Sequence, residues 1–230
     1  MNRGAGPAPA PDVKDSGDIP PETFTTSSGL AERAFPVLYG LVTAPAERGW
    51  LGRRRAALLA SATGTVVEIG AGPGANLAHY RNADRVVATE PSPYMRARLL
   101  RRTASVPVEV VAAPAEALPV ADASADTLVS VCVFCTVQDL GAALSEVMRV
   151  LRPGGRLLFL EHVRAAGAMA RVQHALDPVW SRAAAGCHLT RRSEQAIRET
   201  GMQVVRLGRF KPPVPGGGLM PMVAGAAIRP

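Results

Sequence analysis

The sequence predicts an α/β protein whose strands form a doubly wound, largely parallel sheet. Three observations support this: β-branched apolar runs alternate with helix-like segments, glycines follow the first run, and an acid ends the second. The glycines are Gly70, Gly72 and Gly74, and the acid is Glu90. Ligands bind such sheets at the carboxyl ends of the strands, so we expect a site there.

Helical periodicity begins at Leu30. Apolar residues recur at helical spacing up to Leu41, and again between residues 50 and 59, which predicts two helices before the first strand. Pro45 is well suited to begin the second helix. Tyr39 either covers a site or is an ordinary core aromatic residue.

The remaining elements follow in alternation. Strands are expected at residues 65–69, 85–89, 108–111, 127–134, 156–162, 203–209 and 223–228. Helices are expected to begin at residues 76–80 and 91–93, and to cover residues 140–151, 168–185 (with a break near Pro178) and 193–200. Residues 1–28 are rich in Pro, Gly, Ala and Ser and lack apolar periodicity, so we expect a disordered tail.

Composition narrows the class of protein. The chain of 230 residues is 47% hydrophobic, which suits one globular domain with a substantial core. No apolar run approaches the roughly 20 residues of a membrane span, and we expect neither a secretory signal nor a membrane anchor. The three cysteines are too few for a disulfide framework, which favours a cytoplasmic location.

The net charge of +7 raises the question of a nucleic-acid partner. Of the 26 basic residues 24 are arginines, scattered over several elements rather than forming one stripe. Aromatic residues make up only 4% of the chain, so platforms for stacking bases are scarce. We therefore expect no nucleic-acid partner and interpret the charge as a bias toward arginine.

The glycine turn resembles a known cofactor site. The spacing G-x-G-x-G differs from the G-x-G-x-x-G of dinucleotide folds, and Glu90 stands where an acid can accept hydrogen bonds from a ribose diol. Glu68 precedes the turn and either accepts hydrogen bonds from turn N–H groups or stands near a bound ammonium group. This arrangement resembles class I, Rossmann-like S-adenosylmethionine-dependent methyltransferases over about residues 30–228.

A closer resemblance lies within that class. Residues 132–137, 161–163, 173–180 and 186–191 resemble the methyltransferase-like-seven group, whose known members methylate small alkyl thiols. The resemblance implies a seven-stranded methyltransferase sheet in a single domain, residues 29–230. Its parts are an N-terminal helical cap (29–62), a core that binds the cofactor (63–164), and an acceptor-side insertion with the last strands (165–230).

The resemblance also implies the cofactor contacts. S-adenosyl-L-methionine is the expected cofactor and S-adenosyl-L-homocysteine its product. Many members of the class bind the adenine amino group with an acid after the third strand, where this chain has Pro114, Ala115 and Glu116. We rank Ala115, through its backbone N–H, above Glu116. The expected cofactor-binding residues are Glu68, Gly70, Gly72, Gly74, Glu90, Pro91, Ala115, Glu116 and Cys132.

Cys132 and Cys135 form a C-x-x-C pair, but neither redox nor zinc chemistry is the favoured interpretation. Such redox pairs usually begin a helix, whereas we expect these residues on a strand, with side chains on opposite faces. Zinc would need two further ligands at matching spacing, and none is apparent, so we expect no metal. Cys135 and Thr136 are expected to line the acceptor site at the end of the fourth strand.

Three histidines are candidates near the acceptor. His162, at the end of the fifth strand, and His174 are the candidate general bases for a protic acceptor. A thiol, with an ordinary pKa of about 8.5, would need little help from a base. The expected substrate-binding residues are Tyr39, Cys135, Thr136, Asp177, Trp180 and His188.

The predicted function is methyl transfer from S-adenosylmethionine to a small molecule by in-line displacement, with thiols as the first acceptors to test. One alternative is an O- or N-methyltransferase of a secondary metabolite. Others are an RNA-binding or RNA-modifying protein, suggested by the charge, and a protein that binds the cofactor without turnover. The oligomeric state is left open.

Overall fold

A seven-stranded sheet forms the centre of the molecule, in the order β3-β2-β1-β4-β5-β7-β6. The computed structural model describes residues 29–230, with side chains from Arg33 onward; the expected disordered tail lies outside the described residues. β1 to β5 are parallel, and β7 is antiparallel to both β5 and β6. The strands are β1 (Gly64–Ile69), β2 (Ala83–Thr89), β3 (Val108–Val111), β4 (Ala125–Val131), β5 (Leu151–His162), β6 (Gln203–Phe210) and β7 (Met222–Ile228).

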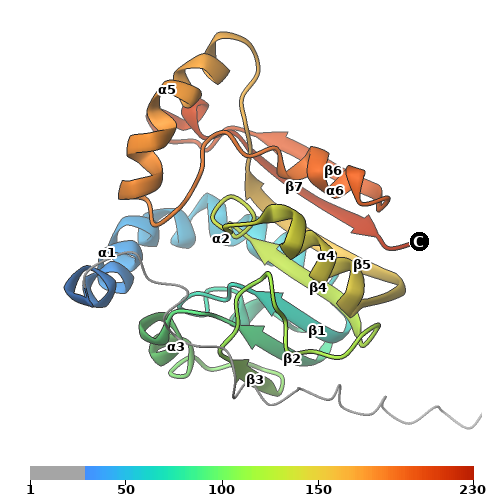
Figure 1. Ribbon diagram of the computed structural model, residues 1–230. Helices are drawn as coiled ribbons and strands as arrows, with labels where there is room; N and C mark the ends of the chain where they lie inside the picture. The colour runs from blue at the N-terminus through green and yellow to red at the C-terminus, as the bar shows by residue number, and fades with distance from the viewer. Residues whose placement is uncertain (1–28) are drawn as a thin grey trace, which may run out of the picture.

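Helices cover both faces of the sheet, which confirms the doubly wound prediction (Figure 1). On one face, α4 (Leu140–Val150) and α6 (Ser193–Glu199) pack against a core that includes Phe159. On the other face, α2 (Trp50–Leu59) and α3 (Pro93–Leu99) pack against a second core. β1, β2, β4 and β5 contribute to both cores, which explains their nearly unbroken apolar sequences.

The N-terminal cap consists of two helices, but the boundary between them was predicted wrongly. α1 (Gly29–Arg48) contains Pro45 in its last turn, and α2 begins only at Trp50. Proline has a helical φ but no N–H, so Pro45 deprives the last turn of one backbone hydrogen bond without ending the helix there. The break falls at Gly49, whose φ of −110° and ψ of −119° are not helical.

Two other boundaries differ from the prediction around the glycine turn. Residues 76–80 form one turn of 3₁₀ helix (Leu77–His79) rather than the start of an α-helix, because Tyr80 leaves the helical region and the chain enters β2 at Ala83. β4 ends at Val131, three residues early, because Cys132 adopts a left-handed conformation with a φ of 59°.

α5 (Gly167–Ala183) projects beyond the sheet at the top of Figure 1 and continues through Pro178 without the expected break. Of its side chains only Ala170 and Gln173 are buried. The Gln173 amide donates to the backbone oxygen of Leu219, 2.9 Å away, and its oxygen accepts from Ala165 N–H at 2.7 Å. Among the described residues, none of the helices combines the length and the apolar character that a bilayer crossing requires.

Candidate active site

The glycine turn follows β1 and leaves open space above one of its members. Gly70, Gly72 and Gly74 all have positive φ, at 58°, 55° and 83°. A Cβ on Gly70 would lie 2.7 Å from the Val133 side chain, whereas a Cβ on Gly72 would meet nothing within 4 Å. Gly72 therefore presents bare backbone to a space that a ligand can enter.

Glu90 fixes this turn from the end of β2. Its carboxylate accepts hydrogen bonds from Gly72 N–H at 2.8 Å and from Ser92 N–H at 2.9 Å, one on each oxygen. Each oxygen has a second lone pair, so the group retains capacity for the hydroxyls of a bound ribose. Burial raises the pKa of Glu90, while the Ser92 and Gly72 N–H groups act in the opposite direction.

Glu68 lies beneath the turn, and its hydrogen-bond partners differ from the turn N–H groups named in one of the two expectations. It accepts hydrogen bonds from the Asn76 amide at 2.8 Å and the Tyr80 hydroxyl at 2.9 Å, rather than from turn N–H groups. Asn76 in turn accepts from Arg55, which is paired with Glu47 of α1 at 2.8 Å. This buried chain of side chains joins the cap to the glycine turn, and burial raises the pKa of Glu68 to about 7.

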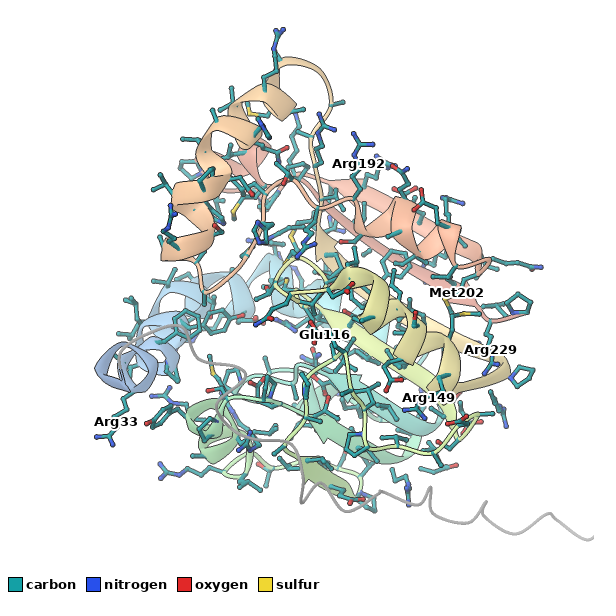
Figure 2. The ribbon with its side chains drawn as sticks, in the orientation of Figure 1. Arg33, Glu116, Arg149, Arg192, Met202 and Arg229 are labelled. Carbon is teal, nitrogen blue, oxygen red and sulfur yellow. The ribbon has the colours of Figure 1, made fainter. Side chains whose placement is uncertain are left out.

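The loop after β3 contains the two candidate adenine contacts in different settings. Ala115 is buried in the core beside α4. The Glu116 carboxylate accepts from the backbone N–H groups of Gln138, at 2.9 Å, and Asp139, at 3.3 Å. Glu116, labelled in Figure 2, thus secures the start of α4. Pro91 is half-buried directly after Glu90.

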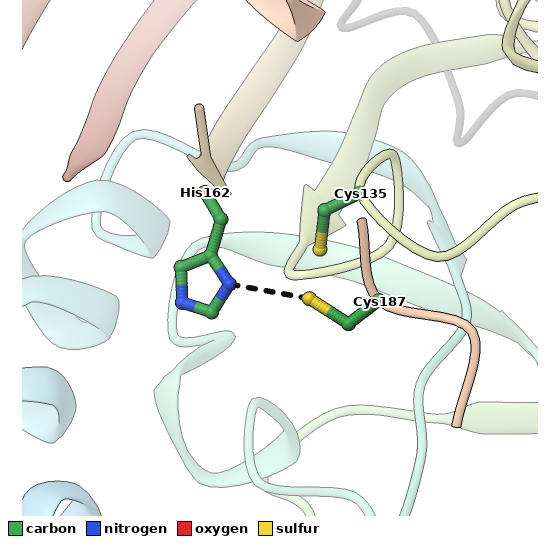
Figure 3. Close-up of side chains that lie close together, drawn as sticks. All are labelled: Cys135, His162 and Cys187. Atoms are coloured by element: carbon green, nitrogen blue, oxygen red, sulfur yellow. Dashed lines mark hydrogen bonds between the residues drawn. The ribbon is translucent and has the colours of Figure 1, made fainter. Parts of the chain in front are cut away.

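On the acceptor side, three nucleophilic or basic side chains from different segments converge at the ends of β4 and β5 (Figure 3). The Cys187 sulfur lies 3.5 Å from His162 Nδ1, and the ligand atoms of Cys135, His162 and Cys187 all lie within 4.8 Å of one another. The sequence alone indicated no partner for Cys135 beyond Cys132. It missed this group because its members lie up to 52 positions apart and only the fold brings them together.

The cysteines differ in their electrostatic surroundings. The Cys135 thiol, donating to the Cys187 sulfur, lowers the pKa of Cys187, and His162 acts in the same direction. The same contact raises the pKa of Cys135. Burial raises the pKa of Cys132 to about 12, so this thiol stays protonated. Tyr39 lies close enough to Cys132 that burial and this neighbour together raise the pKa of its phenol.

A buried acid that the sequence analysis did not select supports the cluster. Glu161 is fully buried; it accepts hydrogen bonds from Ser130 Oγ at 2.6 Å and Val133 N–H at 3.1 Å. It also lies 3.4 Å from Cys135 N. Glu161 therefore holds the turn that carries Cys135. A charged residue in an apolar strand was the only sequence signal for this role.

The other expected acceptor-side residues are divided between two places. Asp177 Oδ2 lies 2.9 Å from His188 Nδ1, and Asp177 also accepts from Leu189 N–H, which ties α5 to the loop carrying Cys187. The Trp180 indole N–H is buried; it makes no well-aligned hydrogen bond within the described chain, but it lies close enough to the Cys187 sulfur to help lower the pKa of that thiol. Thr136 is half-buried beside Cys135. His174 lies on the exposed face of α5, outside the cluster.

The fold and this edge of the sheet define a class I S-adenosylmethionine-dependent methyltransferase. Residues 67–159 match the family described as "Methyltransferase domain". The human thiol S-methyltransferase TMT1B is 32% identical over 214 residues, 87% of this chain and 88% of the relative. Human TMT1A is 34% identical over 172 residues, 72% of this chain and 70% of the relative. The chain belongs to the family of these thiol S-methyltransferases.

Solved structures share the fold at lower sequence identity. A Thermotoga maritima protein described as a possible histamine N-methyltransferase has a TM-score of 0.64 and 20% identity, covering 87% of this chain and 99% of its own. A geranyl diphosphate C-methyltransferase from Streptomyces coelicolor, solved with S-adenosyl-L-homocysteine, has a TM-score of 0.60 and 18% identity, covering 74% of each chain.

The described residues fit S-adenosylmethionine as the cofactor. The open space over Gly72 admits a ligand to the backbone, and Glu90 ends β2 with free lone pairs beside it. Both features belong to the carboxyl ends of neighbouring parallel strands, where such folds bind nucleosides.

Proposed function

We propose that this methyltransferase acts on the sulfur of a small-molecule thiol. The observation that carries the proposal is the 32% identity to human thiol S-methyltransferase TMT1B over 87% of the chain, which includes the segments that bear Cys135, His162 and Cys187. The acceptor side of the site is rich in sulfur and half-buried aromatic surface. Such a surface suits an apolar thiol better than a strongly hydrated acceptor.

The donor site, in this proposal, is built from the glycine turn and Glu90. Bound S-adenosylmethionine supplies an activated methyl group on a sulfonium. Glu90 holds the ribose, Gly70, Gly72 and Gly74 allow close approach of the backbone, and Pro91 and Ala115 border the adenine. Glu68 acts from below by keeping the turn in shape, and we assign Glu116 the same supporting role for the start of α4.

The acceptor would enter between the cap and the loop after α5. Tyr39, Cys132 and Thr136 border this entrance, and Asp177 with His188 holds the loop closed over Cys187. The Trp180 indole N–H, beside the Cys187 sulfur, would face the acceptor. His162 is the imidazole that lies with the reactive sulfurs, whereas His174 would need a shift of α5 to take part. Holding the acceptor in line and excluding water are the chain's main tasks. We also propose a cytoplasmic location, where the three thiols would stay reduced.

The test is a methyl-transfer assay with isotopically labelled donor and matched acceptors. Each alkyl or aryl thiol is paired with the alcohol, phenol or amine of the same skeleton. We expect labelled thioether from the thiols and at least 100-fold less product from their oxygen and nitrogen analogues. Equal or greater transfer to a phenol or an amine would replace the thiol proposal with O- or N-methylation of a metabolite. The same assay with RNA tests the remaining alternative.

A further inference from the structure

Cys135, His162 and Cys187 form a compact group of soft ligands that the methyltransferase fold does not itself require. Cys135 follows β4, His162 ends β5, and Cys187 belongs to the loop after α5 (Figure 3). Cys135 is 1% exposed and Cys187 9% exposed, so both sulfurs are shielded from bulk water. Among the described residues, 29–230, these three form the one group of three or more Cys, His, Asp or Glu side chains whose ligand atoms lie close together.

The spacing of these atoms suits a tetrahedral zinc ion. Zinc binds thiolate sulfur at about 2.3 Å and imidazole nitrogen at about 2.0 Å, which separates a sulfur and a nitrogen ligand by roughly 3.6 Å. The observed distance from the Cys187 sulfur to His162 Nδ1 is 3.5 Å. All three ligand atoms lie within 4.8 Å of one another, so a shared ion needs only small rotamer changes.

The backbone around the group is fixed in the way that metal ligands require. Glu161 accepts from Val133 N–H and lies within 3.4 Å of Cys135 N, which holds the turn of the first ligand. The backbone N–H of His188 donates to the Cys135 backbone oxygen at 2.7 Å and so holds the loop of the third ligand against that of the first. Such surrounding hydrogen bonds orient ligands and raise metal affinity.

We propose that Cys135, His162 and Cys187 bind one zinc ion and leave its fourth position open to the sulfur of the acceptor. Two cysteines and one histidine with an exchangeable fourth ligand are a known form of catalytic zinc site, whereas structural sites have four protein ligands. Two thiolates balance the charge of the ion, and the group lies on the acceptor side of the glycine turn. The ion would therefore mark the place where the methyl acceptor binds.

The zinc ion would promote ionisation of the acceptor thiol. This catalytic role rests on the proposed function, whereas the metal site itself does not. A thiol that coordinates zinc loses its proton outright: the S–H bond breaks, a Zn–S bond forms, and the proton passes to solvent. The bound sulfur keeps a lone pair that would form the new S–CH₃ bond, while the bond from the methyl group to the donor's sulfonium breaks and its electron pair stays on the sulfur of S-adenosyl-L-homocysteine. A thioether has no negative charge and is a poorer ligand, so the product leaves and the position is free again.

The first experiment measures metal binding alone, on the full chain purified under reducing conditions and stripped with a chelator. Zn²⁺ is titrated in competition with a chromophoric chelator, and Co²⁺ is added as a spectroscopic probe. We expect one equivalent to bind, and the Co²⁺ complex to show intense tetrahedral d–d bands with thiolate charge-transfer absorption. Cys135→Ser, Cys187→Ser and His162→Ala should each weaken zinc binding at least tenfold.

Cys132→Ser is the matched control for metal binding, because Cys132 is the third cysteine and lies outside the ligand group. It should retain the zinc affinity of the wild type. Circular dichroism shows which variants fold; if a ligand variant does not, the Co²⁺ spectrum of the wild type still reports thiolate ligation. Binding of far less than one equivalent, an equal loss of affinity in Cys132→Ser, or a Cys135–Cys187 disulfide that persists after purification under reducing conditions would overturn the site.

A second experiment separates the metal site from the proposed function. Calorimetry with S-adenosyl-L-homocysteine is compared for zinc-loaded and stripped protein, alongside methyl transfer to a thiol. We expect unchanged binding of the nucleoside and at least a tenfold loss of thiol methylation on stripping, reversed by Zn²⁺. Full activity without zinc would overturn the catalytic role. Zinc binding with no thiol methylation under any condition would instead refute the proposed function and leave the metal site standing.

Discussion

The donor and acceptor sides of this site are built in opposite ways. On the donor side, contacts span shorter stretches of sequence: Glu90 binds the N–H groups of Ser92, two positions away, and Gly72, 18 positions away, and Glu68 binds Asn76 eight positions away. On the acceptor side, Cys187 meets His162 from 25 positions away and Glu161 meets Ser130 from 31. The donor motif lies within two consecutive strands and the segment between them, so it can be recognised in the sequence. A site assembled from more distant segments can change its chemistry without disturbing the donor side.

The largest effect is expected on the acceptor side, from Glu161→Ala. Three buried donors, the Ser130 hydroxyl and the N–H groups of Val133 and Cys135, would lose their acceptor. Unpaired buried donors cost about 1–3 kcal/mol each, so we expect a loss of about 4 kcal/mol in the free energy of unfolding, measured with urea at pH 7. Glu109→Ala, on the exposed side of β3, should change stability by less than about 0.5 kcal/mol. Equal stability of the two variants would contradict the role given to Glu161.

Glu68 should make stability fall with rising pH. Burial raises its pKa from 4.5 to about 7, so the folded protein binds more protons than the unfolded chain between these values. The stabilisation is complete below pH 4.5 and is lost as pH rises through 7, by about 3 kcal/mol. Glu68→Gln cannot ionise, and unfolding curves across this range should show a flatter pH dependence than the wild type. An unchanged slope would mean that Glu68 is charged throughout.

Glu90→Ala tests the donor side directly. The change removes the acceptor of the Gly72 and Ser92 N–H groups and the expected partner of the ribose. We expect calorimetry to show affinity for S-adenosyl-L-homocysteine at least 100-fold lower, equivalent to roughly 2.7 kcal/mol. Asp84→Ala, at an exposed position of the same strand, is the control and should bind normally. Normal binding by both variants would remove Glu90 from the site.

The smallest change in stability is expected from a pair of glycine substitutions, which together separate backbone strain from contact with the ligand. Gly72 and Gly154 both have positive φ, and a Cβ on either would meet nothing within 4 Å. Gly72→Ala and Gly154→Ala should therefore each lose about 1 kcal/mol of stability. Only Gly72→Ala should weaken S-adenosyl-L-homocysteine at least tenfold, because its methyl group fills the space over the turn. Equal binding by the two variants would show that no ligand approaches Gly72.

Sequence reasoning succeeded where structure is local. Residues close together in the chain were enough to predict the doubly wound sheet, the glycine turn after the first strand, and Glu90 at the end of the second. The structure has these features as predicted. It failed where a contact depends on a side chain from a distant part of the sequence. Nothing near Cys135 indicates that Cys187 reaches it, and nothing in α2 indicates that Arg55 binds Asn76 beneath the turn.

The same limit explains the misplaced boundaries. Pro45 satisfies the local rule for a helix start, yet the chain breaks at Gly49. The segment after Gly74 has helical character, yet Asn76 and Tyr80 are drawn to Glu68, which leaves room for one 3₁₀ turn. Local propensity is a weak preference that tertiary contacts override.

The row of buried side chains from Glu47 through Arg55 and Asn76 to Glu68 has a consequence for how the molecule loosens. Peeling the two N-terminal helices away would carry off the Arg55 guanidinium, leaving the buried Asn76 oxygen without its donor and the acid of β1 without the nearby positive charge. The two helices of the cap and the glycine turn should thus protect their backbone amides from hydrogen exchange as one cooperative unit. Because the glycine turn also binds the nucleoside, a bound ligand should slow amide hydrogen exchange in α1 and α2, which the nucleoside does not touch.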